Sequence, residues 1–258
     1  IFFLIFVILK LMMYMKKIFL VLSILLLIYS IFNIFNWFDD SSSIAKESEE
    51  IVNTVSANNT NETTEVADDV KTYQSSVNFT PLEQLNSDVV GWIKVDGTDI
   101  DYPFVQTTDN SYYLNHSFTK EENKSGWIFL DYRNDINNLG KNTIIYGHSR
   151  YDSSMFGSLR NSLKQTWFNN SENREIHLYT KNGDTVWQIF SVYHLPNTTD
   201  YLATSFKDST EFNSFIKLIK NRSIFNFGID ISKDDKIITL STCYRLDDRM
   251  VMHGKLIK

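Results

Sequence analysis

The chain of 258 residues is 43% hydrophobic and 22% charged, which is enough for one sizeable domain with additional segments. The formal net charge is −6, and the acidic residues gather in residues 39–70, where nine carboxylates accompany a single lysine. The remainder from residue 71 is nearly neutral, which argues against nucleic acid as a partner. One cysteine excludes an internal disulfide, and the five histidines show no close metal-binding spacing. We therefore expect neither a structural zinc site nor a cofactor.

The first recognisable segment is an uncharged apolar run over residues 18–38. A helix needs about 20 such residues to cross the hydrocarbon core of a membrane. Lys16 and Lys17 precede the run and Asp39 follows it, so the positive-inside rule predicts a cytoplasmic N-terminus and an extracellular remainder. A cleaved signal peptide is the alternative, but no small-x-small cleavage site follows the apolar core. We favour an uncleaved single-pass anchor over residues 1–38.

The first fourteen residues allow two interpretations, because the chain does not begin with methionine. Met15-Lys16-Lys17 has the pattern of a natural start, so residues 1–14 are either an upstream translation artefact or an extension of the apolar region.

Residues 39–72 follow the anchor and consist mainly of Ser, Asn, Thr, Glu and Asp with scattered valines. Such a segment buries too little apolar surface to offset the entropy of ordering. We expect an acidic flexible tether here, with at most a helical turn near residues 44–55. The folded domain is then expected over residues 73–258.

Within that domain, short β-rich segments outnumber helical ones. Thr80-Pro81-Leu82-Glu83 predicts a short helix capped by Thr80, and apolar residues at helical spacing predict an amphipathic helix over residues 209–220. A further helical pattern covers residues 157–165. Strands are expected over residues 89–95, 100–106, 126–131, 142–146, 175–180, 185–194, 236–243 and 249–257. About eight short strands with few helices indicate a mainly β domain, either a barrel or a sandwich.

The last two expected strands hold the only cysteine, Cys243, and an arginine, Arg249, on either side of a five-residue loop. Cross-strand neighbours in such a hairpin lie about 5 Å apart. A cysteine is nucleophilic as the thiolate, and a nearby permanent cation favours that form. Strand alternation places Ser241 and Cys243 on one face, and Arg249 and His253 on one face of the return strand.

A cysteine that cleaves an amide also needs a proton donor for the leaving amine. His148 is the best candidate because it ends an apolar strand and follows a glycine, which exposes its imidazole at a strand edge. His253 competes, since it is near Cys243 in sequence and shares the predicted face of Arg249. From the residues alone, a nucleophile and an inert buried thiol are equally good interpretations of Cys243.

The segment Thr239-Leu240-Ser241-Thr242-Cys243 resembles the TLxTC active-site signature of sortases, the membrane-anchored cysteine transpeptidases of Gram-positive bacteria. The resemblance extends over residues 79–258 and is greatest for class B. It also rests on Gly91-Trp92-Ile93, Ile100-Asp101-Tyr102-Pro103, Asp109-Asn110 with Tyr113-Leu114, Tyr146-Gly147-His148, and the run from Arg249 to Ile257. It implies a closed sortase-type β-barrel of about eight strands with short decorating helices.

This resemblance also implies the chemistry. Cys243 would be the nucleophile, His148 the acid/base, and Arg249 the oxyanion or substrate clamp, while His253 would be structural. Members with this pattern cleave a surface protein's C-terminal sorting signal after threonine, form a thioacyl-enzyme, and pass it to a peptidoglycan amine. Ser241 and Tyr244 are expected to contact the substrate threonine.

Three alternatives stay open at this point: a pilin-polymerising sortase, a mainly hydrolytic sortase, and a catalytically inert surface binding protein. The loop between Cys243 and Arg249 is shorter than in several class B members and contains a second arginine, Arg245. Arg249 is preferred as the clamp because it opens the return strand.

Overall fold

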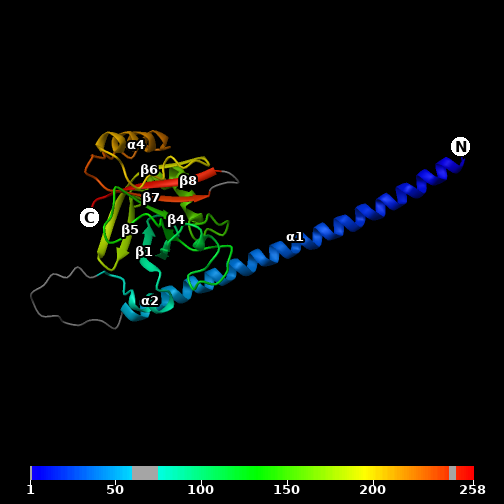
Figure 1. Cartoon of the computed structure of the whole chain (residues 1–258), viewed down its shortest axis with the longest axis horizontal. Coiled ribbons are helices and arrows are strands. Elements are labelled where there is room, and N and C mark those ends of the chain that lie inside the picture. Colours follow the sequence, from blue (N-terminus) through cyan, green and yellow to red (C-terminus); the bar gives the residue numbers. More distant parts are fainter. Residues whose placement is uncertain (1, 60–74, 244–247) are drawn as a thin grey trace, which may run out of the picture. The chain divides into compact units, whose positions relative to one another are not determined.

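Most of the chain after residue 74 forms a closed β-barrel (Figure 1). The structure is a computed structural model that describes residues 2–59, 75–243 and 248–258. Eight strands close in the order β1-β2-β3-β4-β7-β8-β6-β5. The pairs β2/β3 and β4/β7 are parallel, and the other pairs are antiparallel. The sequence prediction of a closed eight-stranded barrel is therefore confirmed.

The strand bounds are β1 Val89–Val95, β2 Asp101–Val105, β3 Phe129–Leu130, β4 Asn142–Tyr146, β5 Glu175–Thr180, β6 Gly183–Pro196, β7 Ile237–Cys243 and β8 Asp248–Leu256. The helical elements are α1 Phe2–Asn59, α2 Thr80–Leu85, η1 Tyr112–Leu114, η2 Gly157–Leu163, α3 Gln165–Asn169 and α4 Ser209–Arg222, where η denotes a 3-10 helix.

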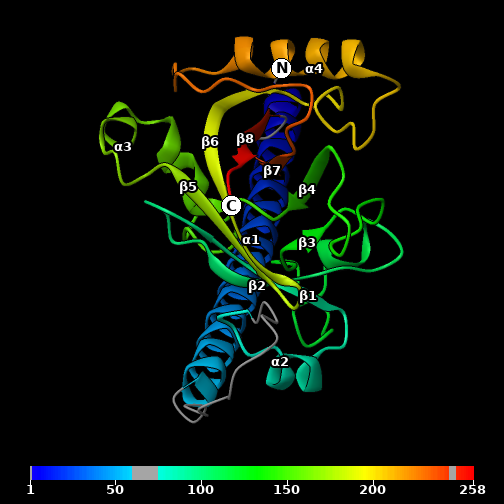
Figure 2. The same cartoon turned by 90° about the vertical axis from the view of Figure 1, so that its left-hand side faces the viewer.

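Strand alternation divides the apolar residues of β7 and β8 between two cores. Ile238 and Leu240 belong to the barrel interior, whereas Ile237 and Val251 belong to a second core outside the barrel wall. Helix α4 covers that second core with its apolar stripe, and Figure 2 shows it lying across one side of the barrel, opposite the end that carries α2. Asp208 caps α4 by accepting hydrogen bonds from the backbone N–H groups of Thr210 and Glu211. Ser241 shares a face with Ile237 along β7, and His253 shares a face with Val251 along β8, so both lie on the outer face of the barrel wall.

The tether prediction is wrong for residues 39–59, because helix α1 continues to Asn59. Ile44, Ile51 and Val55 are buried, and their spacing of seven and four residues places them on one helical stripe. Glu47 adds polar contacts: its Oε1 accepts hydrogen bonds from the Thr119 backbone N–H at 2.7 Å and the Ser117 hydroxyl at 3.2 Å. The compact unit that contains the barrel accordingly begins at Ile44. Residues 60–72 of the expected tether lie outside the described residues.

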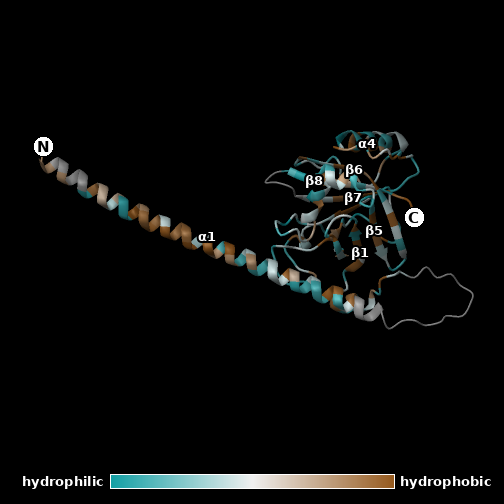
Figure 3. Cartoon of the chain, turned by 180° about the vertical axis from the view of Figure 1, so that it is seen from behind, coloured by the Kyte–Doolittle hydropathy of each residue, from teal (hydrophilic) through white to brown (hydrophobic). Residues whose placement is uncertain are grey.

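The first compact unit, residues 1–43, is helical. Within the described residues, α1 is the one helix long and apolar enough to cross a membrane, over Lys10–Val55 by length and composition. Figure 3 shows its hydrophobic residues along the N-terminal part and hydrophilic residues toward its C-terminal end. This is consistent with the anchor that the sequence predicts.

Two smaller expectations also needed correction. The strand expected over residues 126–131 is only Phe129–Leu130, because Gly126 has φ +58°, a left-handed conformation that does not fit a strand. Thr80 is the first residue of α2 rather than its cap, and its backbone N–H donates to Asn78 Oδ1 at 3.0 Å.

Candidate active site

A cleft of about 310 Å³ opens at one end of β4, β7 and β8. One wall comes from the strand ends and from the segment containing Asn110 and Leu114. A second wall comes from the connection between β6 and α4, which contributes Asn197, Thr198, Thr199, Tyr201 and Leu202. His148, Ser241 and Arg249 line this cleft, so three of the five residues that the sequence singles out lie around it.

The β7/β8 hairpin brings the backbones of Cys243 and Arg249 together. They are directly paired residues in the antiparallel ladder, as the sequence predicts. Cys243 is the last residue of β7, and the position of its side chain is outside what the structure describes. Tyr244 and the rival Arg245 also lie outside the described residues.

The parallel pair β4/β7 brings His148 to the same end. Tyr146 pairs with Ser241, and the ladder continues with a hydrogen bond from the Gly147 N–H to the Ser241 carbonyl at 3.3 Å. Parallel strands advance together, so His148 and Cys243, each two residues past this pair, lie at the same edge. The register joins two residues that are far apart in sequence.

Two contacts fix the His148 ring and backbone. Its Nε2 lies 2.7 Å from the Leu114 carbonyl oxygen, which can only accept, so Nε2 carries a hydrogen. Its own carbonyl accepts from the Phe156 N–H at 2.9 Å. The backbone of Gly126 packs against the His148 ring and leaves no space for a side chain. A Cβ there would stand 2.8 Å from His148 Cδ2 and 2.5 Å from the Tyr113 carbonyl oxygen. A neutral His148 would then have Nδ1 as its acceptor.

Arg249 is half-buried at the edge of the cleft. Its guanidinium donates to the backbone carbonyl of Asp248 through Nη1 at 3.4 Å. Among the described residues, no carboxylate forms an ion pair with it. A cation without a carboxylate partner can stabilise negative charge that develops on a substrate oxygen.

Ser241 is buried at the floor of the cleft, and its hydroxyl lies 3.0 Å from the Tyr201 hydroxyl. This contact joins the strand β7 to the wall formed by residues 197–202. No pattern in the sequence singles out Tyr201, which follows the polar stretch after β6.

His253 lies away from the cleft, in the sealed layer beneath α4, where none of its surface is exposed. Its Nδ1 is 2.9 Å from the Thr239 hydroxyl and its Nε2 is 2.9 Å from the Tyr193 hydroxyl. Burial lowers the pKa of His253 to about 3. A neutral, fully enclosed imidazole cannot exchange protons with a substrate in the cleft.

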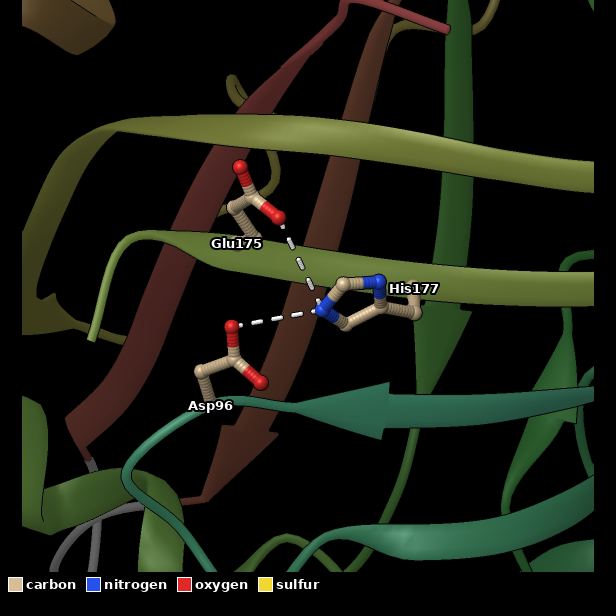
Figure 4. A group of neighbouring side chains, drawn as sticks. All are labelled: Asp96, Glu175 and His177. Atoms are coloured by element: carbon tan, nitrogen blue, oxygen red, sulfur yellow. Dashed lines mark hydrogen bonds and ion pairs between the residues drawn. The ribbon is translucent and has the colours of Figure 1, made fainter. Parts of the chain in front are cut away.

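One group in the described residues has the composition of a metal site. Asp96, Glu175 and His177 meet on the outer side of β1 and β5, with His177 Nε2 at 3.2 Å from Asp96 and 3.8 Å from Glu175 (Figure 4). None of the three lines the cleft. Sequence spacing did not reveal the group because Asp96 and Glu175 are distant in sequence and adjacent only through the β1/β5 pairing. An ion-paired histidine explains the arrangement without a metal.

Comparisons with known proteins identify relatives of this chain. The family model described as the sortase domain matches residues 93–257. Sortase B of Listeria monocytogenes is 39% identical over 180 residues, which cover 68% of this chain and 72% of the relative. Sortase B of Staphylococcus aureus is 37% identical over 184 residues, which cover 70% of this chain and 75% of the relative.

Solved structures of similar proteins share this fold. A 2.0 Å crystal structure of Staphylococcus aureus sortase B has a TM-score of 0.66 at 38% identity and covers 70% of this chain and 86% of its own. A Bacillus anthracis protein described as similar to sortase B has a TM-score of 0.67 at 36% identity, covering 81% and 97%. A Staphylococcus aureus sortase B–substrate complex has a TM-score of 0.65 at 37% identity, covering 70% and 84%.

Proposed function

The chain belongs to the sortase family of cysteine transpeptidases, with its greatest resemblance to class B, and we propose that Cys243, His148 and Arg249 carry its reaction. Cys243 is the nucleophile, His148 the general acid and base, and Arg249 the cation that stabilises the oxyanion. The strand register supports this assignment most directly, because β4, β7 and β8 bring these three backbones to one end of the cleft.

The substrate is a surface protein with a C-terminal sorting signal, cleaved after threonine. The Cys243 thiolate attacks the threonine carbonyl carbon, and negative charge moves to the oxygen beside Arg249. The C–N bond then breaks as His148 delivers a proton to the leaving amine, which leaves a thioester on Cys243. An acceptor amine attacks this thioester, His148 takes up the proton of the amine, and the thiolate is restored.

The acceptor is a peptidoglycan amine at the outer face of the cell membrane. The apolar helix α1 anchors the chain as a single span, with Lys16 and Lys17 on the cytoplasmic side and the barrel outside. Ser241 supports a substrate contact because it lines the cleft, and Tyr244 is assigned the same role because it directly follows Cys243 in the sequence.

Mass spectrometry of reaction products tests the proposal. The full chain in detergent micelles is incubated with a panel of threonine-containing sorting peptides, with and without an added amine, and Cys243→Ala is the control. We expect a thioacyl adduct on Cys243 and an amine-joined product. A product joined only to water would favour the hydrolytic sortase, and joining to a pilin lysine would favour the pilin-polymerising one.

A catalytically inert binding protein is separated by chemical labelling. A thiol-reactive vinyl sulfone should modify Cys243 rapidly and selectively if the thiolate is the resting nucleophile. Labelling no faster than that of an unperturbed thiol, together with the absence of any thioacyl adduct, would refute the enzymatic role.

A further inference from the structure

Asp131 follows β3 directly, and its fully buried side chain lies behind the cleft. Its Oδ2 accepts hydrogen bonds from Asn110 Nδ2 at 3.0 Å and from the Tyr146 hydroxyl at 2.8 Å. Arg133 binds the same carboxylate through Nε at 2.8 Å and Nη2 at 2.6 Å, and its backbone N–H donates at 2.9 Å. Asn110 and Tyr146 both line the cleft, so one carboxylate holds two parts of the same wall.

Arg133 connects these contacts to the second wall of the cleft, which residues of the connection between β6 and α4 form. While it binds Asp131, its Nη2 also donates to the Leu202 carbonyl at 3.1 Å. Leu202 belongs to the connection between β6 and α4 that lines the other side of the cleft. The pair of Asp131 and Arg133 therefore links both walls through charge-assisted hydrogen bonds, which are the stronger kind.

The carboxylate also fixes which hydrogen-bonding atoms the wall presents. An ionised carboxylate only accepts, so Tyr146 uses its single hydroxyl hydrogen on Asp131 and keeps only lone pairs for the cleft. The Asn110 amide is held at both ends, because its Nδ2 donates to Asp131 and its Oδ1 accepts from the Tyr132 N–H at 3.0 Å. Within residues 2–59, 75–243 and 248–258, no acceptor takes the second Nδ2 hydrogen of Asn110, which is therefore left for a carbonyl in the cleft.

Asp131 keeps its charge despite its burial. Burial by itself would raise the pKa of Asp131, but the hydrogen bonds from Arg133 and Tyr146 outweigh it and hold the pKa below the usual value. The two acceptor oxygens consequently persist at every pH at which the enzyme would meet its substrate.

We propose that Asp131 is a positioning residue that sets the spacing and the hydrogen-bond polarity of the two cleft walls for an extended peptide substrate. This inference rests on the proposed function. Asp131 contacts no reacting atom and acts through Asn110, Tyr146 and Arg133. A buried ion pair with a purely structural role would change stability and leave peptide selectivity and the mobility of residues 197–206 unaffected.

Asp131→Asn tests this, with Asp235→Asn as the matched control. Asp235 also accepts from a lysine, Lys255 at 2.9 Å, and from a backbone N–H, that of Ser232 at 2.6 Å, and it does not line the cleft. The full chain in detergent micelles is used throughout. Arg133→Lys is a second variant that keeps a cation beside Asp131, but a single ammonium cannot reproduce the fork that reaches both Asp131 and Leu202.

Three measurements are made on each variant. We expect Asp131→Asn to lower kcat/KM for the sorting peptide by about tenfold to a hundredfold, mainly through KM, as misplaced binding groups do. The rate of Cys243 labelling by a small vinyl sulfone should change less than about twofold, because this small reagent reacts with the thiol without binding along the cleft walls. Hydrogen–deuterium exchange of residues 197–206 should be faster in both Asp131→Asn and Arg133→Lys and unchanged in Asp235→Asn.

The exchange measurement decides the inference independently of activity. Exchange over residues 197–206 that matches the wild type in Arg133→Lys and Asp131→Asn would overturn it, as would equal loss of peptide cleavage and vinyl sulfone labelling. If the wild-type chain cleaves no sorting peptide, the proposed function fails, and the exchange comparison still judges whether Asp131 joins the walls. If Asp131→Asn does not fold, Arg133→Lys supplies the same comparison.

Discussion

The unit formed by β4, β7 and β8 holds two histidines in opposite environments. His148 sits at the open end in the cleft, with one ring nitrogen bound to a backbone carbonyl. His253 sits midway along β8 beneath α4, with both ring nitrogens bound and no exposed surface. The histidine closer to Cys243 in sequence is the one that cannot reach solvent. Depth in the fold and strand register, rather than sequence distance, separate the proposed proton donor from the enclosed histidine.

The hydrogen bonds around His253 have one consistent direction. The Thr239 hydroxyl donates to Asn142 Oδ1 at 2.7 Å, so it accepts from His253 Nδ1. Nε2 is then the acceptor of the Tyr193 hydroxyl. Every polar atom of a neutral His253 is satisfied, whereas a second proton would lose the Tyr193 donor in a site without water access.

Removing the histidine at the open end should have the largest effect. His148→Ala is expected to lower kcat/KM by about 10²–10⁴-fold, because the leaving amine loses its proton donor. The melting temperature should stay close to that of the wild type, since the ring is partly exposed. Steady-state kinetics with a sorting peptide checks this, and activity within threefold of wild type would show that another group supplies the proton.

Removing the enclosed histidine should instead act on stability. His253→Ala leaves the Thr239 and Tyr193 hydroxyls without their buried partner and opens a cavity, so we expect a loss of about 3 kcal/mol in the free energy of unfolding. His194→Ala, at a half-exposed ring beside Asp248, is the control and should change little. Denaturant titration measures both. A loss from His253→Ala no larger than that from His194→Ala would contradict the comparison.

Acid should affect the enclosed histidine through folding. The pKa of His253 is about 3 in the folded chain and near 6.5 when unfolded, so below pH 6.5 the unfolded chain binds a proton that the folded chain does not. Stability attributable to His253 is therefore complete above pH 6.5 and falls by up to about 1.4 kcal/mol per pH unit as the pH drops toward 3. Unfolding of wild type and His253→Gln at several pH values isolates this slope. Parallel curves for the two proteins would mean that His253 binds its proton as readily in the folded chain as in the unfolded one.

The smallest expected effect comes from a small displacement of the His148 ring at the open end. Gly126→Ala and Gly228→Ala impose similar backbone strain, because their φ values are +58° and +69°, but only at Gly126 would the new Cβ meet the His148 ring. Gly228→Ala should cost about 1 kcal/mol of stability. Gly126→Ala should cost more, because its Cβ would also stand 2.5 Å from the Tyr113 carbonyl oxygen. Gly126→Ala alone should also reduce kcat by about tenfold by moving the imidazole. Equal activity in the two variants would show that the ring tolerates displacement.

Local patterns in the sequence predicted much of the fold. The runs 89–95, 142–146 and 175–180 match β1, β4 and β5, because short apolar or alternating runs bounded by turn residues specify short strands. The helix over residues 44–59 was not predicted, because the segment is rich in polar and acidic residues and its buried stripe has only three apolar side chains. Barrel closure followed from resemblance to a family, not from any single strand pattern.

Residues of the candidate site could be predicted only where they belong to a short hairpin or to a recognisable sequence signature. Pairing of Cys243 with Arg249 follows from alternation across one short loop. Asp131 and Leu202 gave no comparable signal, since each meets its partner through the tertiary fold. Buried hydrogen-bond networks assemble from distant segments, and no local periodicity encodes them.

The stretch of α1 from Ile44 to Val55 bears on where the chain can be cut. Burying its three aliphatic side chains contributes on the order of 5 kcal/mol, comparable to the whole stability of many domains. A soluble fragment that starts after residue 59 would forgo this contribution and leave the Ser117 and Thr119 donors without the Glu47 carboxylate. The border between anchor and enzyme thus falls inside a continuous helix, and a protease that sheds the barrel intact would have to cleave before Ile44.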